Sequence, residues 1–333
     1  MKKKTVLYIL ALVLGAAVIG SVALGRYPIS VGEIFGILGS KILPIEPFWT
    51  KTQEALLWNH RLPRVLLACL VGAGLSAAGT AYQGVFRNPM AAPDLLGASS
   101  GAALGAAVAI LLGLGSGGIM TLAFASGLLT VGLVVFTGHR TRGKRSLGLI
   151  LSGILIGSLV SSATSFVKLA ADPSDQLPAI TYWLMGSLNG TSFEDVAFAA
   201  VPILLGLGLL QLLRWRLNVL SLGDEEARTI GVHAGRLRMA VIGCATMITA
   251  ASVAVSGVIG WVGLVVPHLM RKLLGSDNRY LMPGSILFGG IFLLLCDDIS
   301  RNLMATEIPL GILTALIGAP LFLFLMVKDG ERT

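Results

Sequence analysis

Apolar segments long enough to cross a lipid bilayer recur along this chain, and they constrain its fold more than any other feature. A transmembrane helix needs about 20 apolar residues to cross about 30 Å of hydrocarbon. Only 13% of the residues are charged, whereas soluble domains carry about 25%. Pro267 and its polar neighbours interrupt the short eighth segment. We expect ten spans, at residues 5–25, 62–84, 95–113, 117–137, 147–168, 194–213, 239–257, 259–274, 281–301 and 308–327.

Basic residues orient these spans. Ten spans place both termini on one side of the membrane, and Lys and Arg are enriched in cytoplasmic loops. With cytoplasmic termini, 18 of the 25 Lys and Arg lie inside, including the cluster at 140–145. The predicted fold is therefore all-α and polytopic, a single transmembrane domain over residues 1–333 with both termini cytoplasmic. The net charge of +8 follows from this topology and does not indicate nucleic acid.

Glycines recur at helical spacing inside several predicted spans. Gly97, Gly101 and Gly105 lie four residues apart, as do Gly153 and Gly157. Such faces let helix backbones approach closely in lipid. We therefore expect a compact bundle.

Residues that carry enzymatic or metal chemistry form no recognisable constellation. The segment from Gly138 to Arg145 has the GxxxxGK skeleton of a phosphate loop. Arg145 stands where Ser or Thr must ligate magnesium, and the segment follows a span instead of a strand. The four histidines are scattered, and Cys69, Cys244 and Cys296 show no ligand spacing. We predict no catalytic residue, no metal site and no cofactor in this chain.

Three arginines at outer helix ends run against the charge rule. Arg61 and Arg64 lie at the outer end of the second span, and Arg301 at that of the ninth. Charge in or beside the hydrocarbon is costly. One interpretation is that these side chains reach the interface and pair locally, since Asp297 and Asp298 precede Arg301 by four and three residues. The other is a positive rim that attracts an acidic partner or an anionic solute.

Two polar loops on the cytoplasmic side carry further candidates. Residues 87–94, RNPMAAPD, hold two prolines that stiffen a short turn. This turn is either a rigid connection or a constriction at the inner mouth of a pathway.

Residues 214–238 form the one long polar stretch between hydrophobic segments, which suits a docking surface for a soluble partner. Ser221 and Asp224 fit a capping box, so we predict a short helix over 222–230. Gly231 would end it, with a second helical stretch beginning near Ala234. The alternative is a solvated amphipathic connection.

Five ordered blocks resemble the permease subunits of type II ABC importers for iron–siderophore complexes, haem and cobalamin. They span almost the whole chain. The blocks are RLPR at 61–64, RNPMAAPDLLG at 87–97, LGDEEARTIGV at 222–232, GWVGLVVPHLMR at 260–271 and IPLGILTALIGAP at 308–320. The resemblance implies a non-enzymatic permease of the prokaryotic inner membrane, paired as a homodimer or with a second permease. Two separate ATPase subunits would bind ATP and magnesium on the cytoplasmic face, and a substrate-binding protein would dock outside.

The resemblance also assigns roles to particular positions. The binding protein would be received by Arg61, Arg64 and Arg301. A cytoplasmic gate would include Asn88, Met90 and Ser146. Residues 183–188 resemble a short helix at the outer mouth. The helix that fits a groove of the ATPase would comprise Leu222, Gly223, Asp224, Glu225, Ala227 and Gly231.

The sequence constrains the identity of the transported solute less directly. A glycine-rich, weakly polar pathway offers few groups that could replace the hydration shell of a bare ion, so it favours a bulky metal chelate. A ferric siderophore is the first expectation, with haem, cobalamin and an oxyanion left open. The competing class, an ion-gradient-driven transporter, would carry ionisable residues near mid-membrane and matching halves, and the spans are poor in such residues.

Overall fold

The computed structural model describes residues 2–25, 27–140 and 145–330, and these ranges contain helices and no strand. A helix corresponds to each of the ten predicted spans, and the all-α prediction is confirmed. These helices are α1 (Lys3–Ala23), α4 (Leu62–Phe86), α5 (Ala98–Leu111), α6 (Ser116–Arg140), α7 (Arg145–Ala170), α9 (Phe193–Leu222), α11 (Ala234–Ser256), α12 (Val262–Leu274), α13 (Asn278–Asn302) and α14 (Leu310–Gly330).

Eight of these helices, all but α5 and α12, are long and apolar enough to cross a membrane. The helices α5 and α12 have only 14 and 13 residues. At 1.5 Å per residue they are about 20 Å long, short of the hydrocarbon thickness of about 30 Å. The predicted count of ten complete spans is therefore approximate. In α12 the helix continues through Pro267 instead of breaking there.

The described residues also form four shorter helices: α2 (Val31–Gly39), α3 (Lys51–Leu56), α8 (Gln176–Met185) and α10 (Asp224–Thr229). A π-helical turn (Leu57–Arg61) joins α3 to α4, so the second predicted span extends into a longer helical segment. A 3₁₀ turn (Pro93–Leu96) precedes α5.

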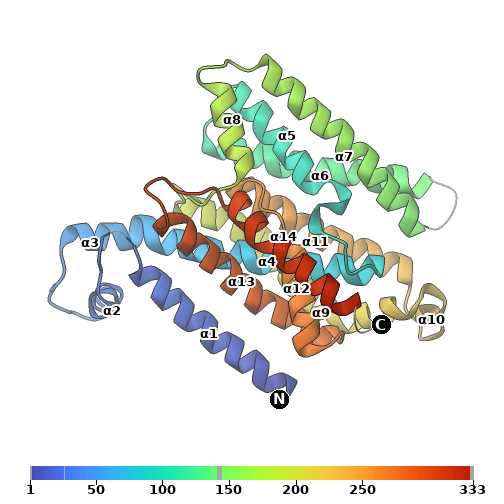
Figure 1. Cartoon of the computed structure of the whole chain (residues 1–333), viewed down its shortest axis with the longest axis horizontal. Helices are drawn as coiled ribbons and strands as arrows, with labels where there is room; N and C mark the ends of the chain where they lie inside the picture. The colour runs from blue at the N-terminus through green and yellow to red at the C-terminus, as the bar shows by residue number, and fades with distance from the viewer. Residues whose placement is uncertain (1, 26, 141–144, 331–333) are drawn as a thin grey trace.

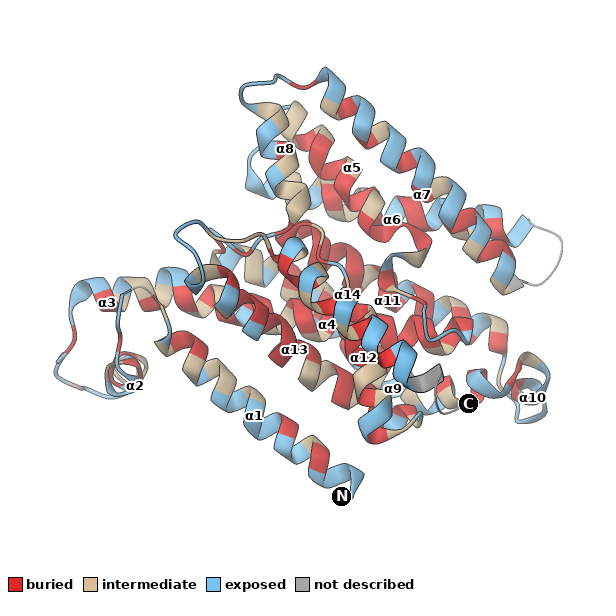
Figure 2. Ribbon diagram, viewed as in Figure 1, coloured by how far each residue is buried: buried red, intermediate tan, exposed pale blue. Residues whose placement is uncertain are grey.

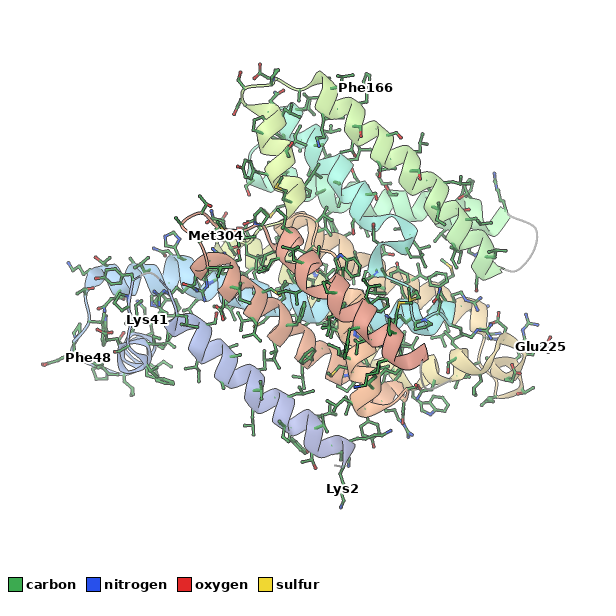
Figure 3. All side chains as sticks on the ribbon, in the orientation of Figure 1. Lys2, Lys41, Phe48, Phe166, Glu225 and Met304 are labelled. Carbon is green, nitrogen blue, oxygen red and sulfur yellow. The ribbon has the colours of Figure 1, made fainter. Side chains whose placement is uncertain are left out.

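The two ends of the helix bundle carry different elements (Figure 1). The N-terminus, the C-terminus and α10 lie at one end, which we name the inner face, and α2 and α3 lie at the other, the outer face. Figure 3 shows the labelled Lys2 and Glu225 toward the first end, and Lys41, Phe48 and Met304 toward the second. This arrangement agrees with termini on one side of the membrane.

The buried core is centred on α4, which packs against α9, α11, α12 and α13. Figure 2 shows α4 and α13 largely buried, whereas α1 and α7 expose much of their surface. Apolar side chains exposed on these two helices would favour aggregation in water. In a bilayer they face lipid without a free-energy cost. The helix α7 packs mainly on α5, α6 and the 3₁₀ turn.

Glycines set the closest helix approaches. A Cβ atom on Gly101 would lie 2.7 Å from the Ser126 carbonyl oxygen, and one on Gly153 would lie 3.3 Å from Leu96 Cα, which confirms the predicted small faces there. Gly157, by contrast, has open space around its Cβ position. The tightest approach joins residues far apart in sequence, with Gly79 of α4 against the Gly263 backbone.

Candidate functional site

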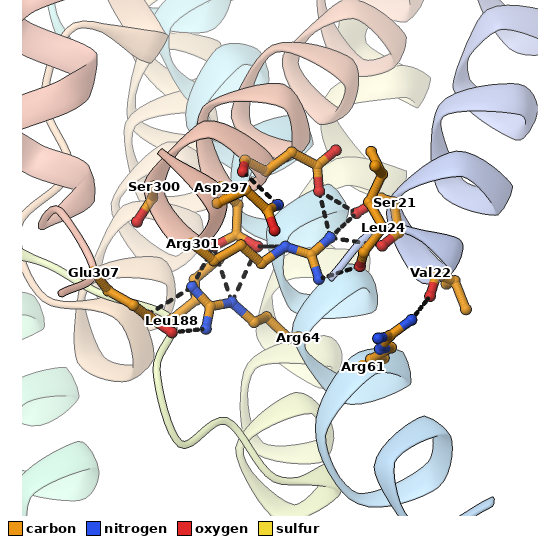
Figure 4. A network of polar contacts seen from close by, with 12 residues as sticks. Ser21, Val22, Leu24, Arg61, Arg64, Leu188, Asp297, Ser300, Arg301 and Glu307 are labelled. Atoms are coloured by element: carbon orange, nitrogen blue, oxygen red, sulfur yellow. Dashed lines mark hydrogen bonds and ion pairs between the residues drawn. The ribbon is translucent and has the colours of Figure 1, made fainter. Parts of the chain in front are cut away.

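The outer ends of α1, α4 and α13 meet in a cluster of charged side chains (Figure 4). We name this the outer polar cluster; its members are Ser21, Arg64, Asp297, Asp298, Arg301 and Glu307. Arg64 donates 2.9–3.0 Å hydrogen bonds to both carboxylate oxygens of Asp297 and 2.9 Å bonds to both of Glu307. Asp297 is fully buried. A buried carboxylate of this kind is stable only with such charged donors around it.

Two of the arginines also terminate α1. The last carbonyl groups of a helix have no partner within it, and the helix dipole makes them favourable sites for cations. Arg61 donates to the carbonyl oxygens of Val22 (2.7 Å) and Ala23 (3.1 Å), and also to that of Tyr27. Arg301 donates to the Leu24 carbonyl oxygen at 3.2 Å. The two guanidinium groups therefore fix the outer end of α1 to α4 and α13.

The predicted local pairing of Arg301 is confirmed. Its guanidinium lies 3.8 Å from Asp297 and also contacts Asp298, which in turn accepts a 2.7 Å hydrogen bond from Ser21. Sequence reasoning missed Glu307 and the α1 carbonyl groups as partners, since each lies far along the chain from the arginine that it bonds. The role of Arg61, Arg64 and Arg301 in receiving a binding protein stays a prediction.

Beside this cluster a cavity of about 780 Å³ opens near the outer face. Hydroxyl, amide and aromatic groups line it, together with Asp195 and Glu307, and the described residues of its lining include no Lys, Arg or His. Both carboxylates are engaged, because Asp195 caps α9 through Ser192 and Glu307 pairs with Arg64. The predicted outer-mouth helix at 183–188 overlaps only the end of α8, which stops at Met185. Residues 186–188 lie beyond the helix, and Trp183 of α8 also lines the cavity.

On the inner face, the polar stretch 214–238 is organised differently from the prediction. The helix α9 continues through Leu222, so residues 214–222 extend that helix. The capping-box prediction at Ser221 is wrong: its hydroxyl donates to the Asn218 carbonyl oxygen at 2.6 Å, and Gly223, with φ +148°, precedes α10. Tertiary continuation of α9 overrides the local capping signal. The predicted second helix is confirmed as α11, which begins at Ala234.

The short helix α10 is anchored on its inward side. Ala227 is fully buried, and Asp224 accepts a 2.7 Å hydrogen bond from the buried Arg238 of α11. Asp224 also lies 4.0 Å from Arg87, which ends α4 in a left-handed conformation and begins the predicted gate loop. The helix α10 and the predicted gate loop are therefore neighbours, a contact that the sequence did not predict.

The turn after α10 and its exposed side complete this element. Gly231 has φ +80°, as expected for a glycine that ends a helix, and Val232 N–H donates to the Ala227 carbonyl oxygen at 2.8 Å. Leu222 and Ile230 are more than half exposed, and Glu225 is exposed between them in the sequence. Apolar side chains beside acidic ones at the surface are typical of a protein-binding patch.

The inner end of α9 is fixed to the start of α13. Asn218 donates a 2.7 Å hydrogen bond to Asp277 and accepts a 2.8 Å bond from the Asn278 backbone N–H. Hydrogen bonds from the Arg279 guanidinium lower the pKa of Asp277 to about 2, so this carboxylate stays charged at neutral pH. The segment that contains α10 therefore begins at an end of α9 that is held in place.

The predicted gate residues lie on the inner face. Asn88 accepts a 2.9 Å hydrogen bond from Met90 N–H, which forms a tight turn, and both side chains are exposed. Ser146 is half-buried in the first turn of α7. A constriction made by these residues stays a prediction. The basic cluster at 140–145 and the phosphate-loop-like segment fall largely on residues 141–144, outside the described residues.

Fold and charge distribution together define a multi-pass, all-helical protein of the prokaryotic inner membrane. The chain belongs to the FecCD transport family, whose model matches residues 11–328. It is therefore a permease subunit of an ABC importer, with ATP hydrolysis on a separate chain.

Two curated relatives and one solved structure match nearly the whole chain. The molybdate import permease MolB of Haemophilus influenzae is 41% identical, covering 97% of this chain and 95% of that protein. The hemin transport permease HmuU of Yersinia pestis is 40% identical, covering 89% and 91%. An ABC transporter solved in an inward-facing conformation, assigned there to the metal-chelate type, is 39% identical with a TM-score of 0.88, covering 98% and 99%.

Proposed function

We propose that this permease carries a metal chelate, in the first place a ferric siderophore. The observation that supports it is the chemistry of the outer cavity. Its volume of about 780 Å³ suits a bulky solute, and its lining offers hydroxyl, amide and aromatic groups without a cationic side chain. A bare oxyanion would need charged or N–H donors to replace its hydration shell. Haem and cobalamin would suit the same cavity chemistry, and one relative is a hemin transport permease.

The test compares the solutes directly. We expect a ferric siderophore, presented by the cognate binding protein, to stimulate ATP hydrolysis by the reconstituted importer and to enter proteoliposomes. Molybdate is the critical comparison because one relative imports it. Stimulation by molybdate and not by a ferric siderophore, haem or cobalamin would overturn the chelate proposal.

The importer would work as a homodimer with two ATPase subunits, which bind ATP and magnesium, and with an extracytoplasmic binding protein. Serines on the exposed side of α7, such as Ser158, Ser162 and Ser165, support a pathway between two copies. A helix face that contacts only lipid at this depth does not need hydroxyl groups. Their hydroxyl groups donate to carbonyl oxygens one turn earlier, so the face is only weakly polar.

Coupling would run through α10. The exposed Leu222 and Ile230 would insert into the ATPase, and Asp224 would transmit movement to Arg87 and to Arg238. The outer arginines would receive acidic residues of the binding protein, with Glu307 as the more exposed of the two carboxylates on Arg64. The inner gate would comprise Asn88, Met90 and Ser146.

Replacing Gly231 with valine should uncouple transport while the fold persists. A β-branched residue at φ +80° adds about 1–3 kcal/mol of backbone strain, and no atom obstructs the side chain itself. The strained turn would move α10, and we expect substrate-stimulated ATP hydrolysis to fall about tenfold. Gly113→Val is the matched control, with φ +67° and open space away from α10. Unchanged stimulated hydrolysis in Gly231→Val would count against the coupling role.

A further inference from the structure

We propose that a cleft between α9 and α11 on the inner face binds the phosphate headgroup of an anionic phospholipid. The cleft has a volume of about 360 Å³. Arg216 of α9 and Arg236 of α11 line it from opposite helices, beside His233. This inference does not depend on the transported solute or on the coupling role of α10.

The electrostatics of the cleft favour an anion. The side chains of Arg216 and Arg236 are exposed, and neither makes an ion pair with a carboxylate among the described residues. Within the part of the chain that the structure describes, no Asp or Glu lines the cleft. The nearby Asp224 is engaged by the buried Arg238. Two guanidinium groups in one concave site can bind a phosphate through paired N–H donors, which is a stronger arrangement than scattered surface charge.

We expect an apolar groove to continue from this charged cleft toward the membrane interior. On α9, Leu209 and Leu213 precede Arg216 by seven and three residues, and on α11, Ala240 and Gly243 follow Arg236 by four and seven. Each set therefore lies on one helical face. Leu213 and Ala240 line the cleft itself, and Gly243 is exposed with open space at its Cβ position. The small residues of α11 leave room for an acyl chain beside the leucines of α9.

The depth of the cleft matches the headgroup region. Trp215 is half exposed next to Arg216, and Leu212, one turn further into the membrane, is 79% exposed. Exposed leucine faces the hydrocarbon, and tryptophan concentrates at the membrane–water interface. Arg216 and Arg236 therefore lie at the level where lipid phosphates are found. A second cavity of about 510 Å³, lined by His139 and Arg228, shares Arg236 and extends the positive surface.

Native mass spectrometry of the full-length chain provides the test. Titration with phosphatidylglycerol should give more lipid-bound protein than titration with phosphatidylcholine. We expect the double variant Arg216→Ala/Arg236→Ala to bind phosphatidylglycerol roughly 25-fold more weakly, because each of the two basic residues near a membrane surface contributes on the order of fivefold. Lys2→Ala/Lys4→Ala is the matched control: it removes the same charge from the inner end of α1, away from the cleft, and should bind normally.

Further arms distinguish the alternatives. Inorganic phosphate at matched concentration should not displace the lipid, since it lacks an acyl chain for the groove. The variant Gly243→Leu, which fills the groove and keeps both arginines, should also weaken phosphatidylglycerol binding. The proposal would be overturned if the two double variants lost the same affinity for phosphatidylglycerol. It would also be overturned if the cleft variant bound this lipid as well as the unaltered chain does. Loss of ATPase co-purification with unchanged lipid binding would assign the cleft to the ATPase instead. A melting temperature near that of the unaltered chain confirms that each variant is folded.

Discussion

Replacing Asp297 with asparagine should destabilise the folded permease by about 3–5 kcal/mol, the effect expected when one partner of a buried ion pair is removed. Asparagine keeps the size of the side chain but removes its charge, which leaves Arg64 with Glu307 alone and Arg301 with Asp298. Asp297 is fully buried, so water cannot compensate. Denaturant titration in mixed micelles, followed through tryptophan fluorescence, measures the change.

The neighbouring carboxylate provides the control. Glu307 is 29% exposed and bonds the same guanidinium group at the same 2.9 Å. Because solvent screens it, Glu307→Gln should cost only about 1 kcal/mol. If both variants lost the same stability, burial would not be the reason for the effect. A double variant Arg64→Gln/Asp297→Asn that recovers part of the lost stability would show that the unpaired buried charge causes the destabilisation.

The second large effect is expected at Gly79, where α4 crosses α12. A single added methyl group in Gly79→Ala would overlap the Gly263 backbone, with its Cβ 2.8 Å from Gly263 Cα and closer still to the carbonyl group. Backbone atoms cannot rotate away, so the helices must separate. We expect a loss of about 3 kcal/mol, at the upper end of the range for overpacking. The yield of monodisperse protein on size exclusion and its melting temperature both report this loss.

Gly132→Ala is the matched substitution. Gly132 lies in α6, is exposed, and has no atom within 4 Å of its Cβ position. Alanine there should be neutral or stabilising by up to about 1 kcal/mol, because it has the higher helix propensity. If Gly79→Ala were tolerated as well as Gly132→Ala, the close crossing of α4 and α12 would not determine the fold.

Hydrophobic segments predicted most of the helices. The ten segments and the second helix beginning at Ala234 correspond to helices in the structure. The errors arose at ends and interruptions: α9 extends past Ser221, and α12 continues through Pro267. A local capping signal or a proline constrains only one turn of the backbone, whereas packing acts along a whole helix, so the tertiary contacts prevailed.

The candidate sites were predicted only in part. Arg64 and Arg301 stood out because outer basic residues oppose the charge rule, and the polar stretch stood out because hydrophobic segments surround it. The sequence did not indicate the residues that these side chains bond. Arg64 bonds residues 233 and 243 positions away, and the contact between Asp224 and Arg87 joins α10 to a different loop.

The sequence by itself therefore determined the membrane location, the approximate spans, the orientation of the charged loops and the family. These properties depend on local hydrophobicity, on charge counts and on motifs, all of which can be read within one segment. Only the tertiary structure decided which helices cross at Gly79, which carboxylates hold Arg64, and which two helices bring Arg216 and Arg236 into one cleft. The physical reason is that one apolar helix in lipid resembles another, and the choice of neighbour depends on shape and polar complementarity between surfaces distant in sequence.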